Sequence, residues 1–189
     1  IAAVQVGGAQ NITVTGSGGI TLIASPDPSG LDDITIHPDV TLATAAGPIQ
    51  FIAGDNILLS DRTVLIAGQA GPTSTADVVF AASGSISLVG TASITASDDI
   101  QLTAGNDVSA QNTARLAATH DIQLSATDEL TLSNQSELTA THDIHLTATD
   151  NITVTDSSQL EAAHDIVLTA ADDIVVTGGT TLTAVNQIA

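Results

Sequence analysis

The sequence predicts an all-β fold, a β-helix (β-solenoid) whose coils each contain three short strands. The tripeptide His-Asp-Ile recurs at 120–122, 142–144 and 164–166, which sets a repeat of 22 residues. Within each repeat the apolar residues fall at offsets 0, 2 and 4, then 8 and 10, then 16 and 18. A fixed period of this length is typical of solenoids, and period-two alternation is typical of strands. No helix is expected.

The central repeat, residues 122–143, shows the pattern most clearly. Carrying its phase in both directions places an apolar residue at every core offset from residue 78 to residue 188, without a gap. We therefore expect regular 22-residue coils over 78–188. In the central repeat the three apolar runs are Ile122, Leu124 and Ala126, then Leu130 and Leu132, then Leu138 and Ala140.

The N-terminal part, residues 1–77, keeps the same phase but contains two insertions. These are expected to be loops at 25–33 and 68–77, because both contain Pro and Gly, which do not fit inside a central ladder of paired strands. We expect one β-solenoid domain over 1–189, with about seven full coils and a partial coil at each end.

The composition suits a narrow core and excludes several classes of partner. Hydrophobic residues make up 43% of the chain, with two Phe and no Trp, Tyr or Met, as stacked aliphatic side chains would require. Two Arg, no Lys and 21 acidic residues give a net charge of -19. Nucleic acid is not an expected partner, because phosphate binding needs cationic side chains. Membrane insertion is not expected either, because no apolar run is long enough.

Two columns of acidic residues are expected at the corners of the coils. Stacked coils would place equivalent carboxylates about 4.8 Å apart, where they repel by roughly 1 kcal/mol even in water. Bound Ca²⁺ would relieve this repulsion, since oxygen-rich turns can coordinate it. The alternative is that Asp and Asn cap nearby backbone N–H groups. The candidate calcium ligands are Asp99, Asp121, Asp143 and Asp165 in the first column and Asp128 and Asp150 in the second.

His120, His142 and His164 directly precede the first Asp column. Imidazoles at this spacing could bind a transition metal or form a pH-sensitive strip. The alternative is an exposed turn residue copied with the repeat. Outward positions are rich in Thr, for example Thr131 and Thr153, which raises ice binding as a further function, although Thr is also common on solvent-facing strands. No Cys is present, which excludes a disulfide framework and CxxC sites.

The repeated motif D-I-x-L-[TS]-A-x-[DN], together with runs such as ELTLS and NITVT, resembles the repeats of filamentous-haemagglutinin-like proteins. These are large bacterial surface exoproteins exported by two-partner secretion. The resemblance is best over 78–188, and the regular 22-residue period is longer than is usual in that family. It implies a right-handed parallel β-helix, secretion, and a role in adhesion or in a biofilm matrix. No receptor-binding motif of the family is present to be transferred.

These observations predict a non-enzymatic extracellular structural rod at the bacterial cell surface. It would be a segment of an adhesin or a subunit of a filament stacked end to end, so its expected partners are the rest of a longer solenoid, further copies of itself, or a host-cell or matrix ligand. An enzyme would need convergent acid and base groups, whereas the paired acids here belong to repeated turns. The alternative function is a ligand- or glycan-binding module acting through the 25–33 and 68–77 loops. No cofactor is required, and Ca²⁺ is the candidate ion.

Overall fold

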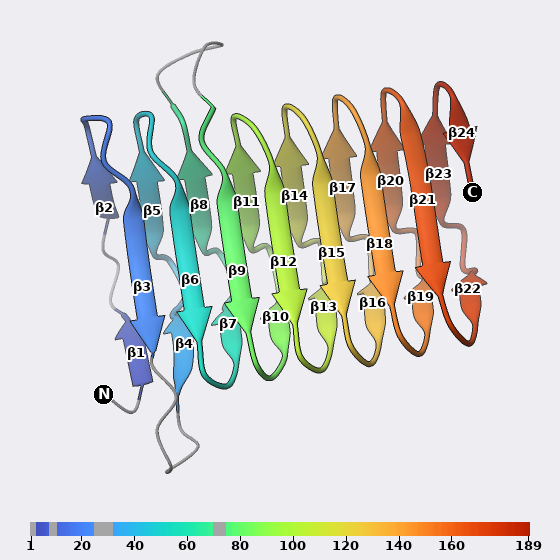
Figure 1. Ribbon diagram of the computed structural model, residues 1–189, viewed down its shortest axis with the longest axis horizontal. Helices are drawn as coiled ribbons and strands as arrows, with labels where there is room; N and C mark the ends of the chain where they lie inside the picture. Colours follow the sequence, from blue (N-terminus) through green and yellow to red (C-terminus); the bar gives the residue numbers. More distant parts are fainter. Residues whose placement is uncertain (1–2, 8–10, 25–31, 70–74) are drawn as a thin grey trace.

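The computed structural model describes residues 3–7, 11–24, 32–69 and 75–189. Within these ranges the chain forms 24 strands in three parallel sheets of eight strands each, and it contains no helix (Figure 1). Accordingly, the described ranges hold no helix that is long and apolar enough to cross a membrane. The predicted β-solenoid is confirmed.

Each coil contributes one strand to each sheet, so neighbouring strands in a sheet come from consecutive coils. In Figure 1 the strands of the nearer sheet run downwards, those of the other two sheets run upwards behind them, and successive coils advance to the right. This winding is right-handed, as the predicted fold requires.

Sheet A carries the core residues at offsets 8 and 10. Its strands, in spatial order, are β1 (Ala3–Val6), β4 (Asp33–Ile36), β7 (Ile57–Leu59), β10 (Ile86–Leu88), β13 (Val108–Gln111), β16 (Leu130–Ser133), β19 (Ile152–Val154) and β22 (Ile174–Val176).

Sheet B carries the core residues at offsets 16 and 18. Its strands are β2 (Asn11–Val14), β5 (Thr41–Thr44), β8 (Val64–Ala67), β11 (Ser93–Ala96), β14 (Arg115–Ala118), β17 (Glu137–Ala140), β20 (Gln159–Ala162) and β23 (Thr181–Ala184).

Sheet C carries the core residues at offsets 0, 2 and 4. Its strands are β3 (Ile20–Ala24), β6 (Ile49–Ala53), β9 (Val78–Ala82), β12 (Ile100–Ala104), β15 (Ile122–Ala126), β18 (Ile144–Ala148), β21 (Asp165–Ala170) and β24 (Gln187–Ile188).

The register follows the repeat in the regular part of the chain. Ile122 pairs with Ile100 on one side and Ile144 on the other, so each residue lies beside its equivalent 22 positions away. A slip of one residue would turn a whole apolar set toward solvent, which is why the alternation fixes the pairing. Equivalent side chains therefore stack in straight columns along the rod.

The core is a narrow aliphatic tube. Ile122, Leu124 and Leu130 are at most 1% exposed. The two phenylalanines also stack in adjacent coils, since the rings of Phe51 and Phe80 lie 4.5 Å apart and 3° from parallel. Continuous burial of this kind ties each coil to both neighbours and explains why a chain with few aromatic residues can form one core.

The two predicted loops lie partly outside the described residues, which exclude 25–31 and 70–74. The prediction for 25–33 is wrong at its end, because Asp33 already belongs to strand β4 and pairs with Ala3. At the second loop, the backbone N–H groups of Gly68 and Gln69 both donate to the Thr44 carbonyl, at 3.1 and 3.0 Å. The described stem of that loop is thus held by the preceding coil.

The corner between sheets A and B has an unusual backbone. Two consecutive residues have positive φ in each of four coils, for example φ of 58° and 66° at Asn112 and Thr113. The Thr113 N–H donates to the Asn134 carbonyl of the next coil at 2.9 Å. This conformation costs a residue with a Cβ about 1–2 kcal/mol, so the corner favours Asn and Gly. The other pairs are Asn134 and Gln135, Asp156 and Ser157, and Gly178 and Gly179.

Candidate functional site

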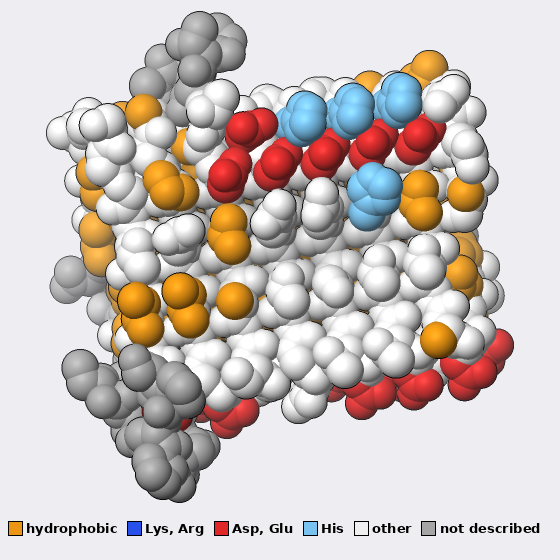
Figure 2. Space-filling view, viewed as in Figure 1, with side chains coloured by type: hydrophobic (Ala, Val, Ile, Leu, Met, Phe, Trp, Pro, Cys, Tyr) orange, Lys and Arg blue, Asp and Glu red, His pale blue; other side chains and the backbone are white. Residues whose placement is uncertain are grey.

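The corner between sheets B and C carries two parallel columns of polar side chains. The residue just before each sheet C core position forms the Asp column, and the residue before that forms the His column. Figure 2 shows the histidines as a ridge along one edge of the molecule, beside a row of acidic side chains. The Asp column is Asp77, Asp99, Asp121, Asp143 and Asp165; the His column is Asp98, His120, His142, His164 and Asn186.

The Asp column caps the backbone from coil to coil. The N–H of Asp121 donates to Oδ1 of Asp99 at 3.0 Å, that of Asp143 to Oδ1 of Asp121 at 3.0 Å, and that of Asp165 to Oδ1 of Asp143 at 2.9 Å. Capping of backbone N–H groups was the alternative that the sequence offered to calcium binding by these Asp residues. Since each N–H stabilises the carboxylate beside it, the column has a source of compensation for its own repulsion.

Each imidazole joins two carboxylates. His142 Nδ1 lies 2.8 Å from Oδ1 of Asp121 in the preceding coil and 3.2 Å from Oδ2 of Asp143 in its own coil. His120 and His164 repeat this arrangement. Their Nδ1 atoms lie 3.0 Å from the preceding carboxylate in both cases, and 3.5 and 3.3 Å from their own. The corner is therefore an alternating chain of carboxylates and imidazoles.

The imidazole rings also stack on one another. The ring centroids of His120 and His142 are 4.8 Å apart, and those of His142 and His164 are 5.0 Å apart, with interplanar angles of 2° and 5°. At the C-terminal end of the column Asn186 takes the place of a histidine, and its Nδ2 donates to Oδ1 of Asp165 at 2.8 Å. The hydrogen-bonding role of the column thus persists where the imidazole is lost.

Three groups at this corner, His120, Asp143 and Asp77, have shifted pKa values. The hydrogen bond to Asp99, together with the charge of Asp121, raises the pKa of His120. Burial alone would raise the pKa of Asp143, but the N–H of Asp165 and the two adjacent histidines lower it overall. Asp77 has no histidine beside it, and burial raises its pKa, with a further contribution from the charges of Asp98 and Asp99. The N–H of Asp165 and the histidines on either side therefore stabilise the ionised carboxylate of Asp143.

The six predicted calcium ligands do not form one site. Asp99, Asp121, Asp143 and Asp165 lie in the Asp column. Asp128 and Asp150 lie at the opposite ends of the sheet C strands and are exposed. Within the described residues, the groups whose ligand atoms come within 4.8 Å of one another all combine Asp with His: His120, Asp121 and His142; His142, Asp143 and His164; and Asp98, Asp99 and His120. Calcium binding remains a prediction.

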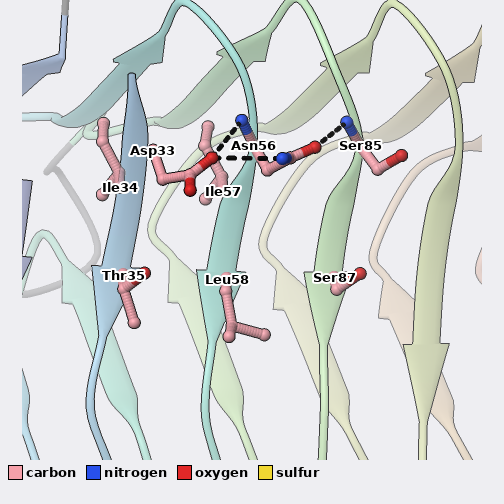
Figure 3. A pocket seen from close by; sticks show the side chains of 8 residues that line it. All are labelled: Asp33, Ile34, Thr35, Asn56, Ile57, Leu58, Ser85 and Ser87. Atoms are coloured by element: carbon pink, nitrogen blue, oxygen red, sulfur yellow. Dashed lines mark hydrogen bonds between the residues drawn. The ribbon is translucent and has the colours of Figure 1, made fainter. Parts of the chain in front are cut away.

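A separate polar column, formed by Asp33, Asn56 and Ser85, lies at the start of the sheet A strands. Oδ1 of Asp33 accepts from the backbone N–H and from Nδ2 of Asn56, at 3.0 and 3.1 Å, and Oδ1 of Asn56 accepts from the Ser85 N–H at 2.8 Å (Figure 3). These groups line a shallow hollow whose wall also includes Leu58. Because the polar atoms bond to one another, this column serves to cap the turns.

The sequence predicted that the histidines would stand in a column beside the Asp column, but it did not predict the bond between the columns. That bond joins residues 21 positions apart, such as His120 and Asp99, one fewer than the repeat. The adjacent order His-Asp within a 22-residue period is the signal that could have revealed it. Comparison of the chain with protein-family models, with curated proteins and with solved structures found no match.

Proposed function

We propose that this chain is a non-enzymatic extracellular structural rod, either a segment of a bacterial surface adhesin or a subunit of a filament. The observation that carries the proposal is that all three sheets run through the stack with eight strands each. Bending such a rod would stretch backbone hydrogen bonds on one side and compress the aliphatic core on the other. A stiff spacer is the role for which this architecture is suited.

The last coil exposes apolar side chains whose equivalents one coil earlier are buried. Ile174 is 47% exposed and Ile188 is 51% exposed, whereas Ile152 and Ile166, their equivalents one coil earlier, are fully buried. A further coil, from the same chain or from a second copy, would cover these residues and pair the strand edges. Both changes are favourable, because they remove apolar surface and unpaired backbone groups from water.

The first coil offers a matching surface. If a second copy continued the stack, Ile174 and Leu182 of one copy would meet Val4 and Ile12 of the next, since these residues occupy the same columns of sheets A and B. Ile12 is 40% exposed in the single chain. The apolar columns would then continue from one copy into the next.

Negative-stain electron microscopy over a range of concentrations tests the filament form of the proposal. Rods that lengthen with concentration are expected, and Ile174→Asp should abolish the lengthening while leaving the single particle folded. The outward-facing Thr153→Asp variant is the matched control and should still lengthen. Short particles at every concentration would exclude the filament subunit and leave the adhesin segment.

The alternative function, ligand or glycan binding through the 25–33 and 68–77 loops, is favoured by one observation. Ile23 and Ile52 are paired in sheet C and point outward, with 50% and 45% exposure, near the strand end that leads into the first loop. Exposed aliphatic residues of this kind can form part of a contact surface. Deleting each loop and measuring attachment to cells and to glycan arrays separates the two functions, because a pure spacer would lose no attachment.

A further inference from the structure

We propose that the His column binds a divalent transition-metal ion of the Zn²⁺, Ni²⁺ or Cu²⁺ class through the imidazoles of two consecutive coils. The ion would lie between His120 and His142 or between His142 and His164. This inference does not depend on the proposed rod function.

The hydrogen bonds of the column fix which ring nitrogen is free. Nδ1 of His142 faces carboxylate oxygens of Asp121 and Asp143 at 2.8 and 3.2 Å, and a carboxylate can only accept, so Nδ1 carries the proton. In the neutral ring the lone pair is then on Nε2. Nε2 of His120, His142 and His164 has no hydrogen-bond partner among the residues that the structure describes.

This is the arrangement by which proteins prepare histidine as a metal ligand. A carboxylate that accepts from one ring nitrogen orients the ring and makes the other nitrogen a stronger donor to the metal. Here the carboxylates of the Asp column supply that contact in three consecutive coils, at 2.8 to 3.0 Å. Nitrogen ligands select transition metals over Ca²⁺, which prefers oxygen.

The spacing of the rings allows two of them to share an ion. Two nitrogens bound to one ion at about 2.0–2.1 Å lie roughly 3.4 Å apart. The ring centroids are 4.8 and 5.0 Å apart and the rings are parallel to within 5°, so the two rings of a pair have to rotate toward each other to bring their Nε2 atoms to this separation. The histidine side chains are 44 to 51% exposed, so they can tilt without disturbing the core. Water molecules would complete the coordination.

The geometry also sets the stoichiometry. His120 and His164 lie two coils apart and cannot reach the same ion, so both possible pairs use His142. Occupying one pair removes the other, and one chelated ion per chain is expected. His142 is therefore the one histidine whose loss eliminates both pairs.

The test is isothermal titration of Zn²⁺, and separately Ni²⁺, into the full chain near neutral pH. Binding of one ion is expected. His142→Gln should weaken it by roughly tenfold or more, because only single-imidazole contacts remain. His120→Gln and His164→Gln should each weaken binding by only about twofold, since each leaves one pair intact. His145→Gln is the matched control, because His145 faces outward from β18 and lies 3.7 Å from Asp143 without joining the stack.

A second readout is the thermal midpoint, which Zn²⁺ should raise in the wild-type chain and not in His142→Gln. Circular dichroism of each variant without metal establishes that it is folded. The proposal is overturned if His142→Gln binds as tightly as the wild-type chain. It is equally overturned if all three histidine variants lose affinity to the same extent, because the ion would then be held by single imidazoles or by the acidic surface alone.

Discussion

Replacing Asp98 with histidine should stabilise the protein by extending the His column by one coil. Asp98 occupies the column position that His120 fills in the next coil, and it lies beside Asp77, whose pKa is raised by burial and by the charges of Asp98 and Asp99. In Asp98→His, the new Nδ1 would face Asp77 as that of His120 faces Asp99, at 3.0 Å. The substitution removes a like charge and supplies a hydrogen-bond donor in one step.

The size of the effect follows from these two changes. Removing a like charge about 4 Å away is worth about 1 kcal/mol in water, and a new hydrogen bond contributes about 0.5–1.5 kcal/mol. The site is half exposed, which reduces both contributions, so a net gain of about 1 kcal/mol is expected. For a chain of this size that corresponds to a rise of about 2–4 °C in the thermal midpoint.

Thermal unfolding followed by circular dichroism at near-neutral pH measures this shift. Asp98→Asn is the matched control, because it removes the charge without adding an imidazole, and it should give a smaller rise. The reverse substitution, His142→Asp, should lower the midpoint by placing a third carboxylate between Asp121 and Asp143. An unchanged or lower midpoint in Asp98→His would refute the idea that the imidazoles stabilise the Asp column.

Three further predictions concern the backbone at the corners, the packing of the core, and the loss of stability at low pH. Thr113→Gly should raise the free energy of unfolding by about 0.5–1 kcal/mol, because Thr113 has a φ of 66° that glycine adopts without strain. Urea unfolding measures this change, and a lower urea midpoint would contradict it. Leu124→Ala, in the core, should lower the free energy of unfolding measured in urea by about 2–5 kcal/mol. Gln123→Ala, on the exposed face of the same strand, should lower it by less than about 0.5 kcal/mol. Similar losses in the two variants would contradict the aliphatic core. The hydrogen bond from Arg62 lowers the pKa of Asp39 below 3.8. The stability that this pair contributes is therefore present above that pH and is lost as the pH falls further. Arg62→Gln should reduce the loss of stability that occurs below about pH 4, and an unchanged loss would contradict the pairing.

The fold could be predicted from the sequence because one rule is repeated in every coil. Ile122, Leu124 and Ala126 alternate with polar residues, and the same alternation returns 22 residues later, so strand, face and register are all set by the same positions. The sequence could not define the start of β4 at Asp33, because an insertion interrupts the phase there and pairing with Ala3 decides the boundary.

The candidate site was predicted only in part, for a different reason. The period places His142 and Asp121 in neighbouring columns, but whether they bond depends on the side-chain torsions at the corner. The capping of the Asp143 N–H by Asp121 was one of the two interpretations of the sequence, but the pattern of residue types does not show that the same carboxylate oxygen also faces the imidazole of His142. The positive φ at Thr113 was also not predicted, because Thr is an uncommon choice for that conformation.

The rod proposal requires that the length of the particle grows in proportion to the number of coils. Small-angle X-ray scattering of a lengthened chain tests this most directly. Inserting four further copies of residues 122–143 after residue 143 adds four coils. The lengthened particle is expected to be longer by about 19 Å, with an unchanged cross-section. A wider cross-section, or a length that does not grow with the number of repeats, would contradict it.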